Sequence, residues 1–345
     1  MAKSINKHLH KARKNKNDEF YTRIEDIEEE LQNYKQHFQD RVILCNCNDI
    51  NGGFHKYFKD NFNLFGLKKL IVTSYNPNGN AMWIECTDRD SVTHTFMGDG
   101  DFRSAEVIEL LEKADVVVTN PPFSLFREFV VQLMNYKKQF IIVGHQYAVI
   151  CKDVFPYIKD NKVWLSCGFK GGATHFYSVY EDNAVSGNHK EGMIRVTGVV
   201  WYTTFDISKR HKEIKLRCKY DESVYPKYDN YNAIEVSRVA NIPKDYDGIM
   251  GVPVTFIGKY NPEQFEIIGS TQRGCHELVP DTKKYDDYWE MKQDGTRTGS
   301  TGNKTNENAN LCRNDGLHNY FINKDGDVVQ TVCGRIFIRN RKPEK

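Results

Sequence analysis

The sequence lacks any long apolar run: no stretch approaches the roughly 18 uninterrupted apolar residues that a membrane-spanning helix needs. The basic first sixteen residues are not followed by an apolar segment, so we expect no secretory signal. There is no internal repeat, and the nine cysteines are irregularly spaced, with Cys45 and Cys47 the one close pair. This spacing argues against a disulfide scaffold or a zinc ribbon. We therefore expect a reduced, cytoplasmic protein without a metal site.

Net charge is also scarce, only +2 over 345 residues, but the charges are unevenly distributed. The first sixteen residues hold basic side chains and no acid, and a second basic run spans residues 209–219. Separate basic clusters on a nearly neutral chain are typical of a protein with one phosphate-facing side, although a solvated face is the commoner explanation of any single run. The candidate phosphate-binding residues are Lys7, Lys11, Arg13, Lys14, Lys16, Lys209, Arg210, Lys212 and Arg217.

Alternating strand and helix patterns fill the first 210 residues. Short apolar runs rich in β-branched residues predict buried strands, and apolar residues at helical spacing predict amphipathic helices between them. Such alternation predicts a mostly parallel sheet with helices on both faces, a doubly wound α/β fold. The predicted strands are 41–45, 69–74, 95–97, 114–119, 139–144, 163–166 and 197–204, and the predicted helices are 104–113 and 125–135.

The periodicity fades after about residue 208. Segments 248–258 and 335–339 still resemble strands, which predicts a second, α+β region. Residues 294–310 are almost entirely Gly, Thr, Asn, Ser and charged residues, so we expect a mobile loop there. Length alone also predicts two domains.

The tetrapeptide Asn120-Pro121-Pro122-Phe123 directly follows the predicted strand 114–119. Its prolines fix φ and lack backbone donors, and Pro121 biases Asn120 away from helical geometry. The Asn120 side chain is thereby presented at the carboxyl end of a strand, the edge where open α/β sheets bind ligands. The Asn120 oxygen and the Pro121 carbonyl make two acceptors for one amino group, and Phe123 can stack on the ring that carries it.

This tetrapeptide resembles motif IV of the amino-methylating, S-adenosylmethionine-dependent methyltransferases, whose consensus is [DNS]-P-P-[YFW]. The resemblance implies S-adenosylmethionine as the cofactor and catalytic roles for Asn120, Pro121, Pro122 and Phe123. An adenine amine is a poor nucleophile because its lone pair is delocalised into the ring. Two acceptors that hold its hydrogens favour a pyramidal nitrogen, so dipoles and positioning supply most of the catalysis.

Two further segments resemble cofactor-binding motifs of these enzymes. Phe20-Tyr21-Thr22 is similar to the FYT-type motif that caps the methionine end of the cofactor. The segment 99–102 is similar to motif III, in which an acid accepts a hydrogen bond from the cofactor's adenine amine and an aromatic residue stacks on its ring. This implies roles for Asp101 and Phe102, with Asp99 as the second choice for the acid.

The loops after the first two predicted strands depart from the pattern of these enzymes. A Gly-rich turn is usual after the first strand, whereas this chain has residues 45–49, CNCND. The second strand normally ends in an acid that holds the ribose hydroxyls, and here it ends in Ser74-Tyr75-Asn76. The candidates for the corresponding hydrogen bonds are Asn46, Asp49 and Asn76.

The segments that depart from the usual pattern are themselves similar to those of one family. The segments KNKNDEFYT, CNCND, FHKYF, GDGDFRS, VVVTNPPFSLFREF, YPKYDNYNAI, GIMGVPVTF and NPEQFE resemble those of the EcoRI-type adenine-specific DNA modification methylases. The resemblance implies a Rossmann-like methyltransferase sheet followed by a C-terminal α+β target-recognition region. It also implies site-specific methylation of adenine N6 in double-stranded DNA, as in restriction-modification or phage or host DNA modification. Because N6 lies inside the duplex, the target base must be flipped out.

We therefore expect a basic N-terminal arm at 1–16, a methyltransferase domain at 17–208 and a DNA target-recognition domain at 209–345. Double-stranded DNA is the expected partner, and we expect no association with a membrane. A cognate restriction endonuclease encoded nearby would act without a stable complex, and we expect a monomer. The resemblance is absent from residues 269–332, which leaves the recognised DNA sequence open.

Alternatives remain at this stage. Similar tetrapeptides serve methylation of RNA adenines and of a protein glutamine amide, and a catalytically inactive DNA-binding protein is a third possibility. Trp201 or Phe205 is a candidate for contact with the flipped base. The tyrosines at 225, 228 and 231 are candidates for DNA contact or for core packing.

Overall fold

The computed structural model describes residues 21–46, 50–168, 173–177, 193–271, 279, 282–332 and 334–344. The chain divides into two compact units, one made of residues 1–148 and 163–207 and the other of residues 149–162 and 208–345. We expected the segment 149–162 in the first domain. It groups with the second unit because its helix α7 (Phe155–Lys159) packs against strand β14 (Phe265–Ser270). The protein is a mixed α/β protein with several sheets.

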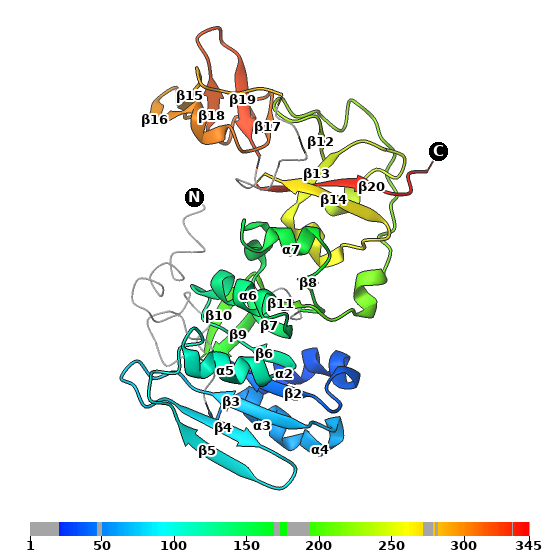
Figure 1. Ribbon diagram of the computed structural model, residues 1–345. Coiled ribbons are helices and arrows are strands. Elements are labelled where there is room, and N and C mark those ends of the chain that lie inside the picture. The colour runs from blue at the N-terminus through cyan, green and yellow to red at the C-terminus, as the bar shows by residue number, and fades with distance from the viewer. Residues whose placement is uncertain are drawn as a thin grey trace. The chain divides into compact units, whose positions relative to one another are not determined.

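The first unit is built on an eight-stranded sheet in the order β5-β4-β3-β2-β6-β7-β11-β8 (Figure 1). Neighbouring strands β3, β2, β6 and β7 run parallel, and the outer strands pair antiparallel. The strands are β2 (Val42–Cys45), β3 (Lys69–Thr73), β4 (Met82–Cys86), β5 (Ser91–Thr95), β6 (Val116–Thr119), β7 (Gln139–His145), β8 (Trp164–Leu165) and β11 (Val199–Thr203).

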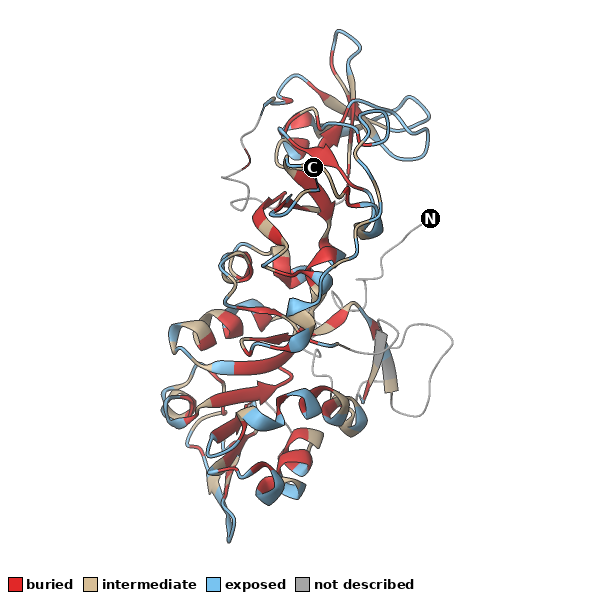
Figure 2. Ribbon diagram, turned by 90° about the vertical axis from the view of Figure 1, so that its right-hand side faces the viewer, coloured by how far each residue is buried: buried red, intermediate tan, exposed pale blue. Residues whose placement is uncertain are grey.

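The central strands form where the sequence predicts them, because β-branched side chains suit a pleated surface buried on both sides. Every residue of β2 and β6 is buried, and Figure 2 shows buried strands at the centre of this sheet. The expected strand at 95–97 is wrong: β4 and β5 form an antiparallel hairpin that ends at Thr95. Residues of β5 are mostly exposed, so this strand has no apolar signal in the sequence.

Five helices of the described first unit accompany the sheet: α2 (Ile24–Leu31), α3 (Gly53–Asp60), α4 (Phe62–Phe65), α5 (Ala105–Lys113) and α6 (Phe126–Asn135). Apolar side chains of α2, α3 and α4 share one core cluster with alternate residues of β2, β3, β6 and β7. The predicted helices 104–113 and 125–135 are confirmed as α5 and α6, and the Ser104 hydroxyl caps α5 by accepting from the amide of Val107.

The start of α6 depends on a glycine in β7. A Cβ built on Gly144 would lie 2.3 Å from the ring of Phe126, the first residue of α6. Phe126 is itself buried, with its ring 4.8 Å from that of Tyr202. The absence of a side chain at Gly144 therefore makes the space into which Phe126 packs.

A second, three-stranded sheet in the same unit has the order β1-β9-β10. Its strands are β1 (Tyr21–Thr22), β9 (Ala173–Tyr177) and β10 (Met193–Thr197), all antiparallel. Thr22 of β1 lies opposite Phe176 of β9, and Tyr21 lies opposite Tyr177. Segments about 150 residues apart in the sequence are thus joined by backbone pairing.

The second unit contains two sheets. One has the order β12-β13-β20-β14, and the other has the order β16-β15-β18-β19-β17. All pairs are antiparallel except that of β12 with β13. The remaining strands are β12 (Ile234–Glu235), β13 (Met250–Pro253), β15 (Trp289–Met291), β16 (Arg297–Thr301), β17 (Asn310–Leu311), β18 (Tyr320–Ile322), β19 (Val328–Thr331) and β20 (Arg335–Asn340).

The expectation of a structureless loop at 294–310 is wrong. The segment contains β16, a 3-10 helix at Gly302–Thr305 and the first residue of β17. Polar contacts with the neighbouring strand support it: the Thr298 hydroxyl donates to Glu290 at 2.6 Å, and the Lys304 ammonium lies 3.2 Å from the same carboxylate. These partners are supplied by the fold and not by an apolar pattern.

The tyrosines at 225, 228 and 231 pack inside the second unit. All three side chains are buried, and the rings of Tyr228 and Tyr231 contact Phe337 of β20. The Tyr228 hydroxyl donates to Glu235, whose carboxylate also pairs with Arg335 at 2.7 Å. Core packing is therefore the role that the structure supports for them. Among the described residues, no helix has the length and apolar character needed to cross a bilayer.

Candidate functional site

Three strand ends meet at one edge of the large sheet. Because β2, β3 and β6 are parallel neighbours, their carboxyl ends face the same way. The Thr73 hydroxyl at the end of β3 donates to Asn46 Oδ1 at 3.0 Å, and the Thr119 hydroxyl at the end of β6 donates to the Asn46 carbonyl. Asn46 itself is 2% exposed. Asn46, one of the sequence candidates for cofactor contact, therefore ties this edge together.

Asn120 is the first residue after β6, so it lies at the same edge of the sheet. It is buried, as is Pro121, whereas Pro122 and Phe123 are half-buried. The amide of Leu125 donates to the Pro122 carbonyl at 3.0 Å, which closes the turn that leads into α6. The tetrapeptide thus sits between a fully buried strand and a helix whose first residue packs under β7.

The tetrapeptide and the β1 segment are connected through β9. The ring of Phe123 meets the ring of Phe176 edge-on, with centroids 6.3 Å apart. Phe176 is fully buried and pairs through its backbone with Thr22. The residues that resemble motif IV and the FYT-type motif are therefore brought together by one buried phenylalanine.

A cavity of about 410 Å³ opens beside β1. It is lined by Thr22, Asn51, the first residues of α3, Lys56 and Tyr177. Thr22 is 5% exposed, and its hydroxyl oxygen is buried without a hydrogen-bond partner among the described residues. A Cβ on Gly53 would lie 3.1 Å from the Thr22 carbonyl, so the glycine allows α3 to approach β1. The cavity combines a helix N-terminus, an ammonium group and an unsatisfied hydroxyl, a donor set suited to a carboxylate.

The turn 99–102 is held against the end of β3. Gly100 has φ +74°, and a Cβ there would lie 2.2 Å from the Ser74 carbonyl. The Asp99 side chain accepts from the amide of Asp101 at 3.0 Å. Asp99 is thus engaged in shaping the turn, and its contact with the cofactor's amine stays a prediction.

Asp101 is paired with Arg103. The Arg103 guanidinium donates to both carboxylate oxygens, at 2.8 and 2.6 Å, and the Arg103 amide donates at 2.8 Å. These hydrogen bonds lower the pKa of Asp101, so its carboxylate stays ionised at neutral pH. The same guanidinium lies 5.2 Å from the ring centre of Phe102. The Phe102 side chain is buried, and its ring meets the ring of Phe129 edge-on. Stacking of Phe102 on a cofactor ring stays a prediction.

Asn76 is occupied within its own turn. Its side-chain amide donates to the Gly79 carbonyl at 2.7 Å, and its side-chain oxygen accepts from the amide of Asn78 at 3.1 Å. Its backbone amide donates to the Asp99 carbonyl at 2.8 Å, which links the loops after β3 and β5. The structure thus shows a turn-forming role for Asn76, and its contact with a ribose stays a prediction.

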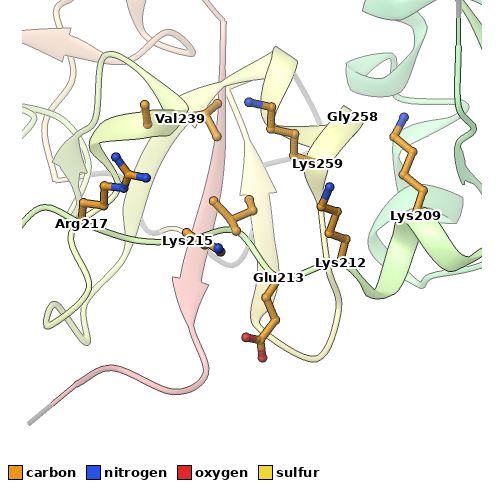
Figure 3. Close-up of a pocket in the computed structure, with 10 residues that line it drawn as sticks. Lys209, Lys212, Glu213, Lys215, Arg217, Val239, Gly258 and Lys259 are labelled. Carbon is orange, nitrogen blue, oxygen red and sulfur yellow. The ribbon is translucent and has the colours of Figure 1, made fainter.

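The second unit has a basic cavity of about 570 Å³. The predicted phosphate-binding residues Lys209, Lys212 and Arg217 line it, together with Lys215 and Lys259 (Figure 3). Sequence reasoning placed Lys215 in the basic run without selecting it, and it missed Lys259 entirely. Lys259 lies more than 40 residues further along the chain at the end of a 3-10 helix, so no local pattern connects it with the others.

Several candidates lie outside the described residues, namely Phe20, Asp49, Lys7, Lys11, Arg13, Lys14 and Lys16. Trp201 and Phe205 are described, and both are buried in the core of the first unit. Trp201 meets the ring of Phe54, and the ring of Phe205 lies 4.6 Å from that of His37. The suggestion that either stacks on a base is not supported, because each ring is covered by the chain's own side chains.

Sequence reasoning also missed Lys56, Phe176 and Arg103. The spacing of Lys56 after the Gly52-Gly53 pair was a possible signal, because a cation one turn into a helix is well placed beside an anion at its N-terminus. Phe176 gave no signal, since only β pairing brings it to Thr22.

Comparisons with known proteins agree with these features. The profile of the family described as "Adenine-specific methyltransferase EcoRI" matches residues 8–340. The chain is 46% identical over 291 residues to Type II methyltransferase M.EcoRI of Escherichia coli, covering 77% of this chain and 89% of the relative. It is 42% identical over 273 residues to M.MgeORF184P of Mycoplasma genitalium and 38% over 270 residues to M.MpnI of Mycoplasma pneumoniae, both type II methyltransferases. Each of these two covers 76% of this chain and 85% of the relative.

Among solved structures, YeaZ from Pseudomonas aeruginosa aligns with a TM-score of 0.17 and 7% identity over 44% of this chain and 72% of that chain. A similarity this low has no bearing on the fold.

Proposed function

Because the chain belongs to the adenine-specific EcoRI methyltransferase family, we infer that it transfers a methyl group to N6 of an adenine at a specific site in double-stranded DNA. It is an adenine-specific DNA methyltransferase of type II. The observation that carries the residue assignment is the position of Asn120-Pro121-Pro122-Phe123 directly after a fully buried parallel strand. The target base is flipped out of the duplex, because N6 is otherwise hidden within it.

We propose that the eight-stranded sheet is the doubly wound, Rossmann-like sheet of this enzyme class. Its parallel centre and the helices α2, α3 and α4 on one face support this proposal. On the other side, Leu44, Val117 and Ile142 alternate with the residues of that core and are equally buried, as expected where helices cover both faces. The antiparallel hairpin β4–β5 takes the place of a further parallel strand.

The Asn120 side chain and the Pro121 carbonyl accept hydrogen bonds from the target amino group. These two hydrogen bonds favour a pyramidal nitrogen whose lone pair faces the methyl donor. Phe123, which is partly exposed, stacks on the purine ring. No strong base is needed, because the nitrogen releases its proton after it has become positively charged. Preorganised dipoles at a buried strand end supply this stabilisation without reorganisation during the reaction.

S-adenosylmethionine, when bound, supplies the electrophilic methyl group on its sulfonium. The residues present fit this cofactor, since the unsatisfied hydroxyl of Thr22 and the cavity beside β1 match its polar methionine end. We propose that Tyr21, Thr22 and Lys56 hold that end, with the cofactor's carboxylate beside Lys56 and the α3 N-terminus. Phe20, Asn46, Asp49 and Asn76 remain proposed contacts from the sequence.

Asp101 fits the adenine end of the cofactor. Each carboxylate oxygen offers about two lone-pair sites. Oδ1 already accepts two hydrogen bonds from Arg103, whereas Oδ2 accepts one and can accept a further hydrogen bond from an adenine amine. Phe102 is the proposed stacking partner of the cofactor's adenine ring. The Arg103 guanidinium lies over the Phe102 ring and would have to move away for the adenine to stack on that face. Asp99 keeps the turn in shape.

The second unit, roughly residues 209–345, is proposed to recognise the DNA target, and the arm 1–16 to contact phosphates. Residues Lys209, Arg210, Lys212 and Arg217 are the proposed phosphate contacts of the second half. Each such contact releases counterions and makes affinity fall with salt. We further propose that the protein acts as a monomer, without a stable complex with any restriction endonuclease encoded near it.

The decisive experiment maps N6-methyladenine in DNA from cells that express the protein, with cells lacking it as the control. Methylation at every copy of one short sequence is the expected result. Incubation of the purified protein with radiolabelled S-adenosylmethionine and duplex DNA, RNA or a protein glutamine substrate tests the alternatives. Label transferred to RNA or protein and not to DNA would overturn the proposal.

A further inference from the structure

We infer that the basic cavity of the second unit binds the backbone of duplex DNA through a fixed row of cations at 212–217, completed by Lys259 from a distant part of the chain. This inference rests on the proposed function, which makes DNA the substrate. The basic cavity is defined here as the 570 Å³ cavity lined by Lys209, Lys212, Glu213, Ile214, Lys215, Arg217, Val239, Ala240, Gly258 and Lys259.

Four cations of the basic cavity, all on described residues, are in no ion pair with an acid. Within the described part of the chain, Lys212, Lys215, Arg217 and Lys259 form no ion pair. Six other cations of the same unit are paired with acids at distances of 3.7 Å or less. These pairs are Lys227–Glu222, Lys244–Glu344, Lys283–Asp229, Lys304–Glu290, Arg335–Glu235 and Arg339–Glu266. Like charges gathered without counter-charges repel one another, and an external polyanion relieves that repulsion.

One acid lies within the basic row, and its side chain is directed elsewhere. Figure 3 shows the Glu213 carboxylate pointing away from the ammonium groups of Lys212 and Lys259. Glu213 therefore forms no ion pair with either lysine, and its single negative charge offsets only part of the positive charge of the lining. The remaining lining residues, Ile214, Val239, Ala240 and Gly258, carry no charge.

The backbone that bears the cations is fixed at two points. The amide of Ile214 donates to Gln264 Oε1 and the Ile214 carbonyl accepts from Gln264 Nε2, both at 2.8 Å. Four residues later, the Cys218 carbonyl accepts from the amide of Lys244 at 2.9 Å. Gln264 directly precedes β14, so the row is tied to a sheet of the second unit.

Between these points the side chains alternate. Lys215 and Arg217 are exposed, and Ile214 and Leu216 are half-buried. Alternation of this kind marks an extended segment, in which residues two apart lie on one face about 6.6 Å from each other. Lys215 and Arg217 thus lie on the same face of a segment whose backbone is already ordered. Because this order exists before binding, the entropy cost of binding a regular polyanion such as the DNA backbone is lower.

The test measures the affinity of the full-length protein for a fluorescent DNA duplex at salt concentrations between about 50 and 200 mM. Log affinity falls linearly with log salt, and the slope counts the phosphates neutralised. Lys215→Gln and Lys259→Gln are each expected to reduce the steepness of that slope by about 1. Lys324→Gln, at an exposed lysine outside the cavity, is the matched control and is expected to leave the slope unchanged.

Unchanged slopes for both variants would overturn the inference. Tighter binding of a duplex RNA of equal length, weakened by the same two substitutions, would overturn the assignment to DNA. The proposed function fails separately: a wild-type protein that binds DNA with the expected slopes but never methylates it would overturn the enzymatic proposal and leave the cavity's role supported.

Discussion

The strand-end site of the first unit and the basic cavity of the second unit differ in whether their polar side chains have partners within the chain. At the strand ends, Asn46, Asn76 and Asp101 all have partners from the chain itself. In the basic cavity, Lys215 and Lys259 have no acidic partner among the described residues. One region is held in a set geometry by internal hydrogen bonds, and in the other these two lysines are left without an acidic partner among the described residues.

This contrast matches two different physical tasks. Methyl transfer depends on placing one nitrogen in line with one carbon, so small displacements are costly and internal bonds that fix the strand ends are useful. Binding of a DNA backbone depends on long-range attraction that many cations share. Substitutions in the first unit should therefore produce large single effects, and those in the second should produce small ones.

The largest effect is expected at Asn120. Asn120→Ala removes one of the two proposed acceptors for the target amine, and loss of one preorganised group of this kind typically costs at least ~100-fold in kcat. DNA binding should persist, because Asn120 is not among the basic residues. Methylation kinetics at saturating DNA, with binding measured in parallel, check this result.

Asn120→Asp is the matched control for that prediction. It keeps an acceptor oxygen at the same position, and an acid is allowed there by the consensus of the enzyme class. It should retain more activity than the alanine variant. Full turnover by Asn120→Ala would remove Asn120 from the mechanism.

The next largest effect is expected at Lys56. Loss of its charge from the cavity beside β1 should weaken the binding of S-adenosylmethionine roughly tenfold, the size of a charge-assisted hydrogen bond. Calorimetric titration of Lys56→Gln with the cofactor measures this directly, without reference to turnover.

Lys59→Gln provides the comparison, because Lys59 is also exposed on the same helix but does not line the cavity. Its affinity for the cofactor should stay at the wild-type value. Equal losses in the two variants would point to a general charge effect and would refute the assignment of Lys56.

A smaller effect, on stability, is expected at Gly144. A methyl group there collides with the ring of Phe126, and such overpacking costs ~1–3 kcal/mol. Gly144→Ala should lower the thermal unfolding temperature by several degrees. It should also lower kcat, because the turn of Asn120-Pro121-Pro122-Phe123 leads directly into α6. Thermal unfolding and kinetics are measured on the same preparation.

Two further variants sharpen this prediction. Gly258→Ala, at a position with no atom within 4 Å of the new methyl, should leave the unfolding temperature unchanged. Phe126→Leu in the Gly144→Ala background should recover part of the loss by making room. An unfolding temperature of Gly144→Ala equal to that of the wild type would contradict the packing argument.

The smallest effect is expected at Gln264. Gln264→Ala releases the backbone of Ile214, so the cation row must be ordered at the moment of binding, which lowers DNA affinity roughly three- to tenfold. The salt slope should stay unchanged, because the number of phosphates contacted is the same. A changed slope would mean that Gln264 alters which cations bind. Gln293→Ala, elsewhere in the unit, serves as the control.

Much of the first unit could be predicted because its signals are local. The runs VILC in β2 and VVVT in β6 are apolar and β-branched, and α5 carries its own cap at Ser104. The hairpin β4–β5 could not be predicted in the same way, since β5 is polar and exposed and is defined by its pairing with β4. The segment 294–310 misled for the same reason, because the partners of Thr298 and Lys304 lie on another strand.

The sequence by itself determined the parallel core, the family and the tetrapeptide that names the chemistry, because each of these depends on residues adjacent in the chain. Only the tertiary structure decided that Phe176 joins the two motifs, that Arg103 holds Asp101, and which lysines are left without an acid. Those outcomes depend on pairing between segments far apart in the sequence, and the free energy of such pairing belongs to the packed whole and not to any local pattern.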